Sequence, residues 1–279
     1  MKQEDAGIRF LYQTQVGRFF LKVLTLPCFS KAGSVFLNSR FSRPMIDRYI
    51  KKYHIDMEQY EKRDYTSFND FFTRKRTKAT PDYTASDLIS PCDGYLSVYK
   101  IGPDSRFTVK NLSYSTRSIL RDKALAKSYE DGYCMIFRLA PYHYHHYSYV
   151  DFGTVLRRRR IEGILHCVRP TACEHFPVYA ENSREYTILR SEHMGVIVQM
   201  EVGALLVGKI RNTHSQSTAA KGEEKGYFEF GGSTIILFAR KGSVALEERF
   251  GNTMDTGIET EVSIGSKIGS CLQGESHGN

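Results

Sequence analysis

The chain has 279 residues, and its 41% apolar and 13% aromatic content is enough for a sizeable folded core, which excludes a disordered protein. Its formal net charge of +8 favours anionic partners, whether nucleic acid, phospholipid headgroups or acidic metabolites. The six cysteines form no CxxC pair and the first residues are polar, so we expect a reduced cytoplasmic setting without a secretory signal. The longest apolar stretch near the start, residues 19–29, contains Lys22 and Pro27 and is too short to cross a bilayer.

Apolar residues recur at helical spacing over residues 8–60, which predicts two or three helices. The first helix carries Arg18 and Lys22 beside its apolar residues, and Lys51 and Lys52 follow in the next stretch. Such helices suit an anionic membrane surface, but amphipathic helices that pack on their own domain have the same pattern. The pattern alone leaves both interpretations open.

A polar segment, residues 74–87, contains Pro81 and several Thr, Lys and Asp residues, and it predicts an exposed loop. After it, short β-prone runs alternate with turns that contain Gly, Asn and Ser. The runs are YLSVYK, YCMIFRLA, YTILR, GVIVQMEVGALLVGKI and STIILFA. The sequence therefore predicts an α+β fold, in which a helical membrane-associating region (residues 1–75) packs on a mostly antiparallel β-sheet domain (residues 76–279).

Two glycines, Gly231 and Gly232, deliver Ser233 directly into the last of these runs. Glycine has no Cβ, so it tolerates strained backbone and the close approach that attack of a serine hydroxyl on the preceding carbonyl requires. An ordinary glycine turn before a strand produces the same pattern. On its own, this segment does not decide between a reactive serine and an ordinary glycine turn.

Asp93 lies in the segment SPCDG, residues 90–94, between a proline and a glycine at a predicted strand end. A carboxylate in that place can orient an imidazole. It can equally close an Asp-Gly turn with its own side chain. Asp93 is thus a candidate site residue with a purely structural alternative.

Histidines cluster in YHYHHY, residues 142–147, after an apolar strand. If the segment is extended, His143 and His145 share a face and could bind zinc or copper, but a third ligand would have to come from a distant part of the chain. A histidine that acts as a general base is the simpler interpretation, and no metal is predicted.

Residues 157–160 are four arginines in succession. They could bind a phosphate backbone, but no helix-turn-helix, zinc-finger or RNP-like pattern accompanies them, so no nucleic-acid partner is expected. An anionic lipid surface, or a solvated strand face without a function, agrees better with the rest of the sequence.

Several segments, taken in this order, resemble phosphatidylserine decarboxylases, and the resemblance covers nearly the whole chain. They are SFNDFF (67–72), SPCDG (90–94), the histidine segment, VGALLVGKI (202–210) and KGEEKGYFEFGGST (221–234). The last of them is highly specific. It changes the interpretation of Gly232–Ser233 from a turn to a predicted self-cleavage site.

The resemblance implies that Ser233 attacks the preceding carbonyl, that the resulting ester breaks by β-elimination, and that a pyruvoyl group remains. The products would be a β chain, residues 1–232, and an α chain, residues 233–279. By position, Asp93 is the orienter, Ser233 the nucleophile and His145 the candidate base. The pyruvoyl group would form a Schiff base with phosphatidylserine and accept the electrons released as CO2 leaves, which gives phosphatidylethanolamine. His145 is also the candidate acid that protonates the headgroup α-carbon.

The histidine segment departs from the family pattern, which reads roughly Asp-Tyr-His-Arg-x-His. The first family histidine matches His145, but the second, usually assigned to self-cleavage, falls on Ser148, whose hydroxyl is no base near neutrality. His143 stands in place of the family aspartate. An impaired enzyme is one outcome, and the other open choices for the base are His145 alone, His146, His166 or His214.

A lipid substrate implies a peripheral protein on the cytoplasmic side of the cell membrane. The expected partners are phosphatidylserine, an anionic membrane surface and, as a heterodimer, the two cleavage chains, with or without a higher homo-oligomer. Two rival functions remain: a metal-dependent hydrolase built on the histidines, and a basic lipid-binding relative that does not process itself.

Overall fold

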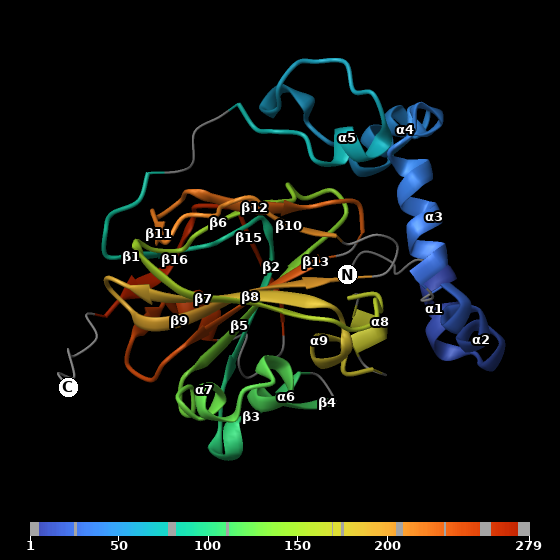
Figure 1. Ribbon diagram of the computed structural model, residues 1–279. Helices are drawn as coiled ribbons and strands as arrows, with labels where there is room; N and C mark the ends of the chain where they lie inside the picture. Colours follow the sequence, from blue (N-terminus) through green and yellow to red (C-terminus); the bar gives the residue numbers. More distant parts are fainter. Residues whose placement is uncertain are drawn as a thin grey trace.

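The structure is a computed structural model that describes residues 6–24, 27–77, 82–109, 112–168, 170–173, 176–204, 209–231, 233–251 and 258–272. Within these ranges a run of short helices precedes several antiparallel sheets, and Figure 1 shows the N-terminal helices, in blue, beside and above the sheets. The predicted α+β class with N-terminal helices is confirmed.

The N-terminal part contains four α-helices where two or three were predicted. They are α1 (Ala6–Gln13), α2 (Gln15–Leu24), α3 (Pro27–Leu37) and α4 (Met45–Tyr53). Two of the boundaries follow the prolines: Pro27 begins α3 and Pro44 directly precedes α4, and proline ends a preceding helix but suits the first turn of a new one. Two 3-10 turns, η1 (Arg40–Ser42) and η2 (Met57–Gln59), and the short helix α5 (Phe68–Phe72) complete this region.

An eight-stranded sheet in the order β11-β7-β8-β9-β13-β5-β2-β15 forms the centre of the β-structure, and its neighbouring strands are antiparallel. Its strands are β2 (Gly94–Lys100), β5 (Tyr133–Leu139), β7 (Gly153–Ile161), β8 (Arg184–Ser191), β9 (Gly195–Gly203), β11 (Thr218–Ala219), β13 (Ser233–Ala239) and β15 (Thr260–Val262). The single run predicted over residues 195–210 is in fact two strands, β9 and β10 (Ile210–Asn212).

Three smaller sheets and several short helices surround this centre (Figure 1). The strands are β1 (Asp87–Ile89), β16 (Lys267–Cys271) and β14 (Val244–Leu246) in one sheet, β10, β12 (Glu224–Phe228) and β6 (His146–Ser148) in the second, and β3 (Arg106–Val109) and β4 (Leu112–Ser115) in the third. The helices are η3 (Pro103–Ser105), α6 (Thr116–Leu120), α7 (Lys123–Lys127), α8 (Pro170–Cys173) and α9 (Val178–Glu181).

Strand β13 is buried along its whole length because both faces of the central sheet are covered. Its side chains alternate between two cores: Ile236 and Phe238 pack in one, Ile235 and Leu237 in the other. Ser233, the first residue of the strand, therefore shares the face of Ile235 and Leu237.

A cluster of aromatic residues joins the N-terminal helices to the β-structure. Phe68, Phe71 and Phe72 of α5 are buried, and Phe230, which lies just before β13, packs against them. The helical region therefore lies directly against the segment that was predicted to be cleaved.

Candidate active site

The strand register brings two of the predicted site residues, Asp93 and Ser233, to the same end of two nearby strands in the central sheet. Ser233 pairs with Leu139 of β5, and on the other side of β5 Tyr95 pairs with Arg138, which places Gly94 opposite Leu139. Neighbouring strands lie about 4.8 Å apart, so the backbones at Gly94 and Ser233 are separated by two such steps, about 10 Å. Asp93, which directly precedes Gly94, enters the sheet at the level of the predicted nucleophile.

Ser233 is fully buried, and its Oγ has no hydrogen-bond partner within the described part of the chain. A buried hydroxyl without a partner is uncommon, because the lost hydration is not replaced, and such atoms often mark sites with a chemical role. Gly231 has a φ of 149°, a conformation that side-chain-bearing residues rarely adopt. Gly232, the other half of the predicted cleavage site, lies outside the described residues.

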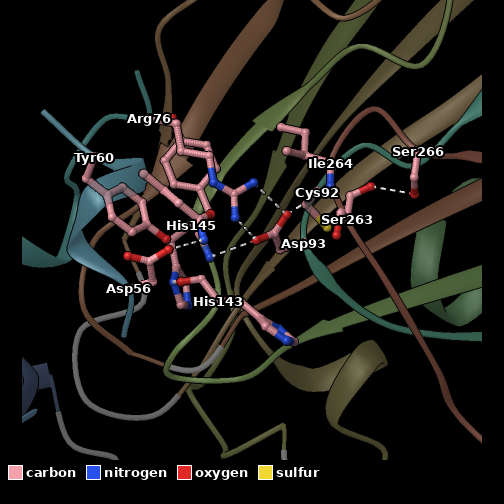
Figure 2. A network of polar contacts seen from close by, with 12 residues as sticks. Asp56, Tyr60, Arg76, Cys92, Asp93, His143, His145, Ser263, Ile264 and Ser266 are labelled. Atoms are coloured by element: carbon pink, nitrogen blue, oxygen red, sulfur yellow. Dashed lines mark hydrogen bonds and ion pairs between the residues drawn. The ribbon is translucent and has the colours of Figure 1, made fainter. Parts of the chain in front are cut away.

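Asp93 is the centre of a hydrogen-bond network that joins distant parts of the chain. Its two carboxylate oxygens accept from Arg76 Nη1 at 3.1 Å and Nη2 at 2.6 Å, as Figure 2 shows. They also accept from the backbone N–H groups of Ile264 at 2.9 Å and Tyr144 at 3.3 Å. The expected contact with an imidazole is not among these bonds; Asp93 instead holds the backbone of Tyr144, the residue directly before His145.

His145 is completely buried, and its ring packs on Phe72 with the ring centroids 4.1 Å apart. Its Nδ1 lies 2.9 Å from the carbonyl oxygen of His143. A carbonyl can only accept, so Nδ1 carries the proton and Nε2 presents its lone pair, and Nε2 has no partner in the described residues. Burial holds the pKa of His145 well below its usual value, so the ring is neutral near pH 7. This is the protonation state that a proton acceptor requires.

The neighbouring histidines do not form the alternating strand on which a metal site was considered. Residues 141–143 form a turn, and only His146 lies on a strand, β6. The ring of His143 is engaged at both nitrogens, since Nδ1 accepts from Ala140 N at 3.0 Å and Nε2 contacts Glu261 at 3.1 Å. Throughout the described ranges no group of three or more His, Cys, Asp or Glu side chains could hold a metal ion.

The other candidate bases differ in how their ring nitrogens are engaged. His146 uses both nitrogens, Nδ1 with Glu224 at 2.9 Å and Nε2 with the carbonyl of Thr73 at 3.0 Å. His166 stacks on Phe176, and His214 lies against Tyr149. His166 Nδ1 and His214 Nε2 are also buried without a hydrogen-bond partner in the described residues, although His214 Nε2 lies 3.4 Å from Glu223. His145 differs from both in its place, since it directly follows Tyr144, whose backbone N–H binds Asp93.

Ser148 lies against the SPCDG turn. Its backbone N–H donates to the carbonyl of Pro91 at 2.9 Å, and its Oγ is 3.5 Å from the same oxygen. The position that resembles the second family histidine is thus close to Asp93 in space. It carries a hydroxyl there in place of an imidazole.

Three contacts from the N-terminal region were not predicted from the sequence. Arg76 binds Asp93, Phe72 covers the ring of His145, and Asn69 Oδ1 accepts from the backbone N–H of Phe230 at 2.9 Å. Phe72 and Asn69 belong to the SFNDFF segment, whose buried aromatic residues indicated a core but not the surface it would face. For Arg76 the sequence contains no comparable signal, because its partner lies across a loop.

Comparison with known proteins agrees with this geometry. The family model described as phosphatidylserine decarboxylase matches residues 68–270. Phosphatidylserine decarboxylase proenzyme 2 of Clostridium acetobutylicum is 43% identical over 269 residues, which cover 95% of this chain and 92% of that protein. Phosphatidylserine decarboxylase proenzymes of Clostridium botulinum (strain Kyoto) and Clostridium perfringens (strain SM101) are 38% and 37% identical, each over 96% of this chain and 95% of the relative. The chain belongs to the phosphatidylserine decarboxylase family.

Proposed function

We propose that this protein converts phosphatidylserine to phosphatidylethanolamine and CO2, with a pyruvoyl group made from Ser233 by self-cleavage between Gly232 and Ser233. The observation that carries the proposal is the buried Oγ of Ser233, which has no hydrogen-bond partner among the described residues and lies at the start of β13, directly after a glycine pair in the sequence. Relatives that are 37–43% identical are named proenzymes, which supports processing of this chain as well.

Apart from one water molecule, self-cleavage needs only groups that the chain itself contains. The Oγ of Ser233 attacks the carbonyl carbon of Gly232, and the amide nitrogen of Ser233 leaves, so the peptide bond becomes an ester. Loss of the Ser233 α-proton then breaks the Cβ–O bond and releases the carboxylate of Gly232. The residue that remains at position 233 is an enamine. Water hydrolyses it, so that oxygen replaces the nitrogen, ammonia is released and the pyruvoyl group remains.

His145 is the proposed acceptor of the Ser233 hydroxyl proton. Its Nε2 has a lone pair, is buried and is not engaged elsewhere, while Nδ1 is fixed by the carbonyl of His143. Asp93 acts in this proposal through position rather than through direct contact with the ring. Its bond to the N–H of Tyr144 holds the backbone that carries His145.

In turnover the pyruvoyl group supplies an electron sink for the pair of electrons left as CO2 departs. The residues at the start of β13 fit such a group, because the sheet fixes the backbone at 233 on both sides, against Leu139 and Gly203. Nε2 of His145 is the proposed site that takes up a proton lost by the substrate amine and then passes it to the headgroup α-carbon. The covering ring of Phe72 keeps water from this imidazole.

The substrate is a bilayer lipid, and exposed aromatic residues on the N-terminal helices support docking to an anionic membrane surface. Large apolar side chains with between 45% and 78% exposure gather in α1, α2, α3 and η1: Phe10, Val16, Phe19, Phe20, Val35, Phe36 and Phe41. Apolar side chains of this size enter the headgroup boundary, and basic residues add attraction to anionic lipids. The described helices include none that is long and apolar enough to cross a membrane. The side chains of Arg18 and Lys22, which first suggested a basic helix face, lie outside the described part.

Intact-mass spectrometry of the purified protein tests the proposal. We expect two chains, residues 1–232 and 233–279, the second with a pyruvoyl group at its first position, and a single uncleaved chain for Ser233→Ala. Two fragments of these sizes from Ser233→Ala would contradict the assignment.

A second candidate, an uncleaved lipid-binding relative, rests on Ser148 and on the Arg76 bond that occupies Asp93. It predicts a single wild-type chain of 32.0 kDa that still binds anionic vesicles.

A further inference from the structure

The segment that contains the proposed cleavage site is fixed at both ends. On one side, the N–H of Phe230 donates to Asn69 Oδ1 at 2.9 Å. On the other, Ser233 is held in the sheet between Leu139 and Gly203. In the sequence only Gly231 and Gly232 separate these two anchors.

The side chain of Phe230 is held as firmly as its backbone. Its ring meets Phe68 and Phe72 of α5 edge-on, each with centroids 5.0 Å apart, and Tyr49 of α4 at 6.5 Å. Edge-to-face pairs of aromatic rings at these separations are attractive beyond the area that they bury. Phe230 is therefore enclosed by the N-terminal helices on several sides.

Helix α5 is itself anchored, which gives Asn69 a defined position. Ser67 caps the helix by accepting from Asp70 N at 3.1 Å, and the N–H of Phe68 donates to Ser42 Oγ at 2.8 Å. The side-chain amide of Asn69 donates to Asn38 Oδ1 at 3.1 Å. This bond orients the amide so that Oδ1, the acceptor, faces Phe230.

An attack of Ser233 Oγ on the neighbouring carbonyl requires an uncommon backbone geometry, and two glycines alone would sample many others. Anchors directly before and after the glycine pair remove most of that freedom, and Gly231 accordingly has a φ of 149°. We propose that Asn69 is a positioning residue for self-cleavage, which holds the Phe230 N–H and thereby places the Gly232–Ser233 peptide bond for attack. The inference rests on the proposed function and assigns the SFNDFF segment a part in it.

Three variants and one rate measurement test the inference. Fragment formation is followed by intact mass in freshly translated protein. Asn69→Leu removes the acceptor for Phe230 and should slow cleavage roughly 100-fold, because small displacements of reacting groups have effects of that size. Asn69→Asp keeps an acceptor in the same place and should restore most of the rate. Asn38→Ala leaves the acceptor on Asn69 in place and removes only the bond that orients its amide, so it should slow cleavage much less than Asn69→Leu, by about three-fold.

The same three substitutions in a Ser233→Ala chain report whether each variant folds, by thermal unfolding of the uncleaved protein. A folded Asn69→Leu chain that cleaves at the wild-type rate overturns the inference, as does a rate for Asn69→Asp as low as that for Asn69→Leu. If the wild-type chain itself never cleaves, it is the proposed function that fails, and the two failures are thus distinguished.

Discussion

Removal of the Arg76 guanidinium should lower the free energy of unfolding far more than the same substitution in an equally well-formed ion pair on the surface. Arg76 and Asp93 share two hydrogen bonds, and their side chains are 22% and 9% exposed. Arg76→Met leaves a nearly buried carboxylate with only two backbone N–H donors, from Tyr144 and Ile264. Breaking a buried pair costs about 3–5 kcal/mol, and the partial exposure of Arg76 places the expected loss at about 3 kcal/mol. For a chain of this size that lowers Tm by about 6–12 °C.

The assay is thermal and urea unfolding of Ser233→Ala chains, so that every variant is compared as one uncleaved polypeptide. Arg63→Met is the matched control, because Arg63 also binds Asp70 through two hydrogen bonds, at 3.0 and 2.6 Å, but these side chains are 40% and 24% exposed. An exposed pair contributes at most about 1 kcal/mol. Asp93→Asn added to Arg76→Met should recover part of the loss, since no buried charge remains. Equal losses for Arg76→Met and Arg63→Met would refute the reasoning.

Three further predictions follow from burial and charge. Lys225→Met should cost about 3–5 kcal/mol at pH 7, because it leaves Glu201 buried without the cation 2.7 Å away. Burial raises the pKa of Glu201, so its carboxylate takes up a proton more readily in the folded state than in the unfolded state. The difference in unfolding free energy between wild type and Lys225→Met, measured in urea, should therefore shrink as the pH falls toward 4.5. A difference that does not change with pH would contradict this. His145→Ala should slow fragment formation by about 100-fold or more, and Asp93→Asn should slow it less; normal rates in both would place the base elsewhere. Phe19→Glu should weaken sedimentation with anionic vesicles about ten-fold or more, since a buried Phe contributes about 1.5–3 kcal/mol, and unchanged binding would remove α2 from the docking surface.

The elements that could be predicted from the sequence are those whose signal is local. The run from Ser233 to Ala239 contains three β-branched residues and is apolar from Ile235 onward, and it is the buried strand β13. A short apolar run between glycines is too short for most helices, so the sequence alone predicted a buried strand there. The same applies to Asp93 and Ser233 at strand ends, because turn residues mark those ends in the sequence.

The contacts that could not be predicted depend on register and on segments far apart in the chain. Nothing in the composition of β5 indicates that Leu139 pairs with Ser233, yet this pairing sets the level of Ser233, the proposed nucleophile, relative to Asp93. The bond between Arg76 and Asp93 crosses a loop, and Asn69 reaches a residue 161 positions away. Such pairs are selected by tertiary packing, which a local pattern does not contain.

Ser148 and Arg76 are best understood together. A carboxylate has about four lone-pair sites, and Asp93 already accepts four hydrogen bonds, two from Arg76 and one each from Tyr144 and Ile264. An imidazole that depended on Asp93 would have to displace one of these donors, and the fork of Arg76 is the strongest of them. The hydroxyl of Ser148 does not compete for a hydrogen bond to Asp93, because it lies against the carbonyl oxygen of Pro91. In this chain the carboxylate is therefore committed to the architecture of the site, and the proposed mechanism assigns proton transfer to His145, whose Nε2 has no hydrogen-bond partner among the described residues.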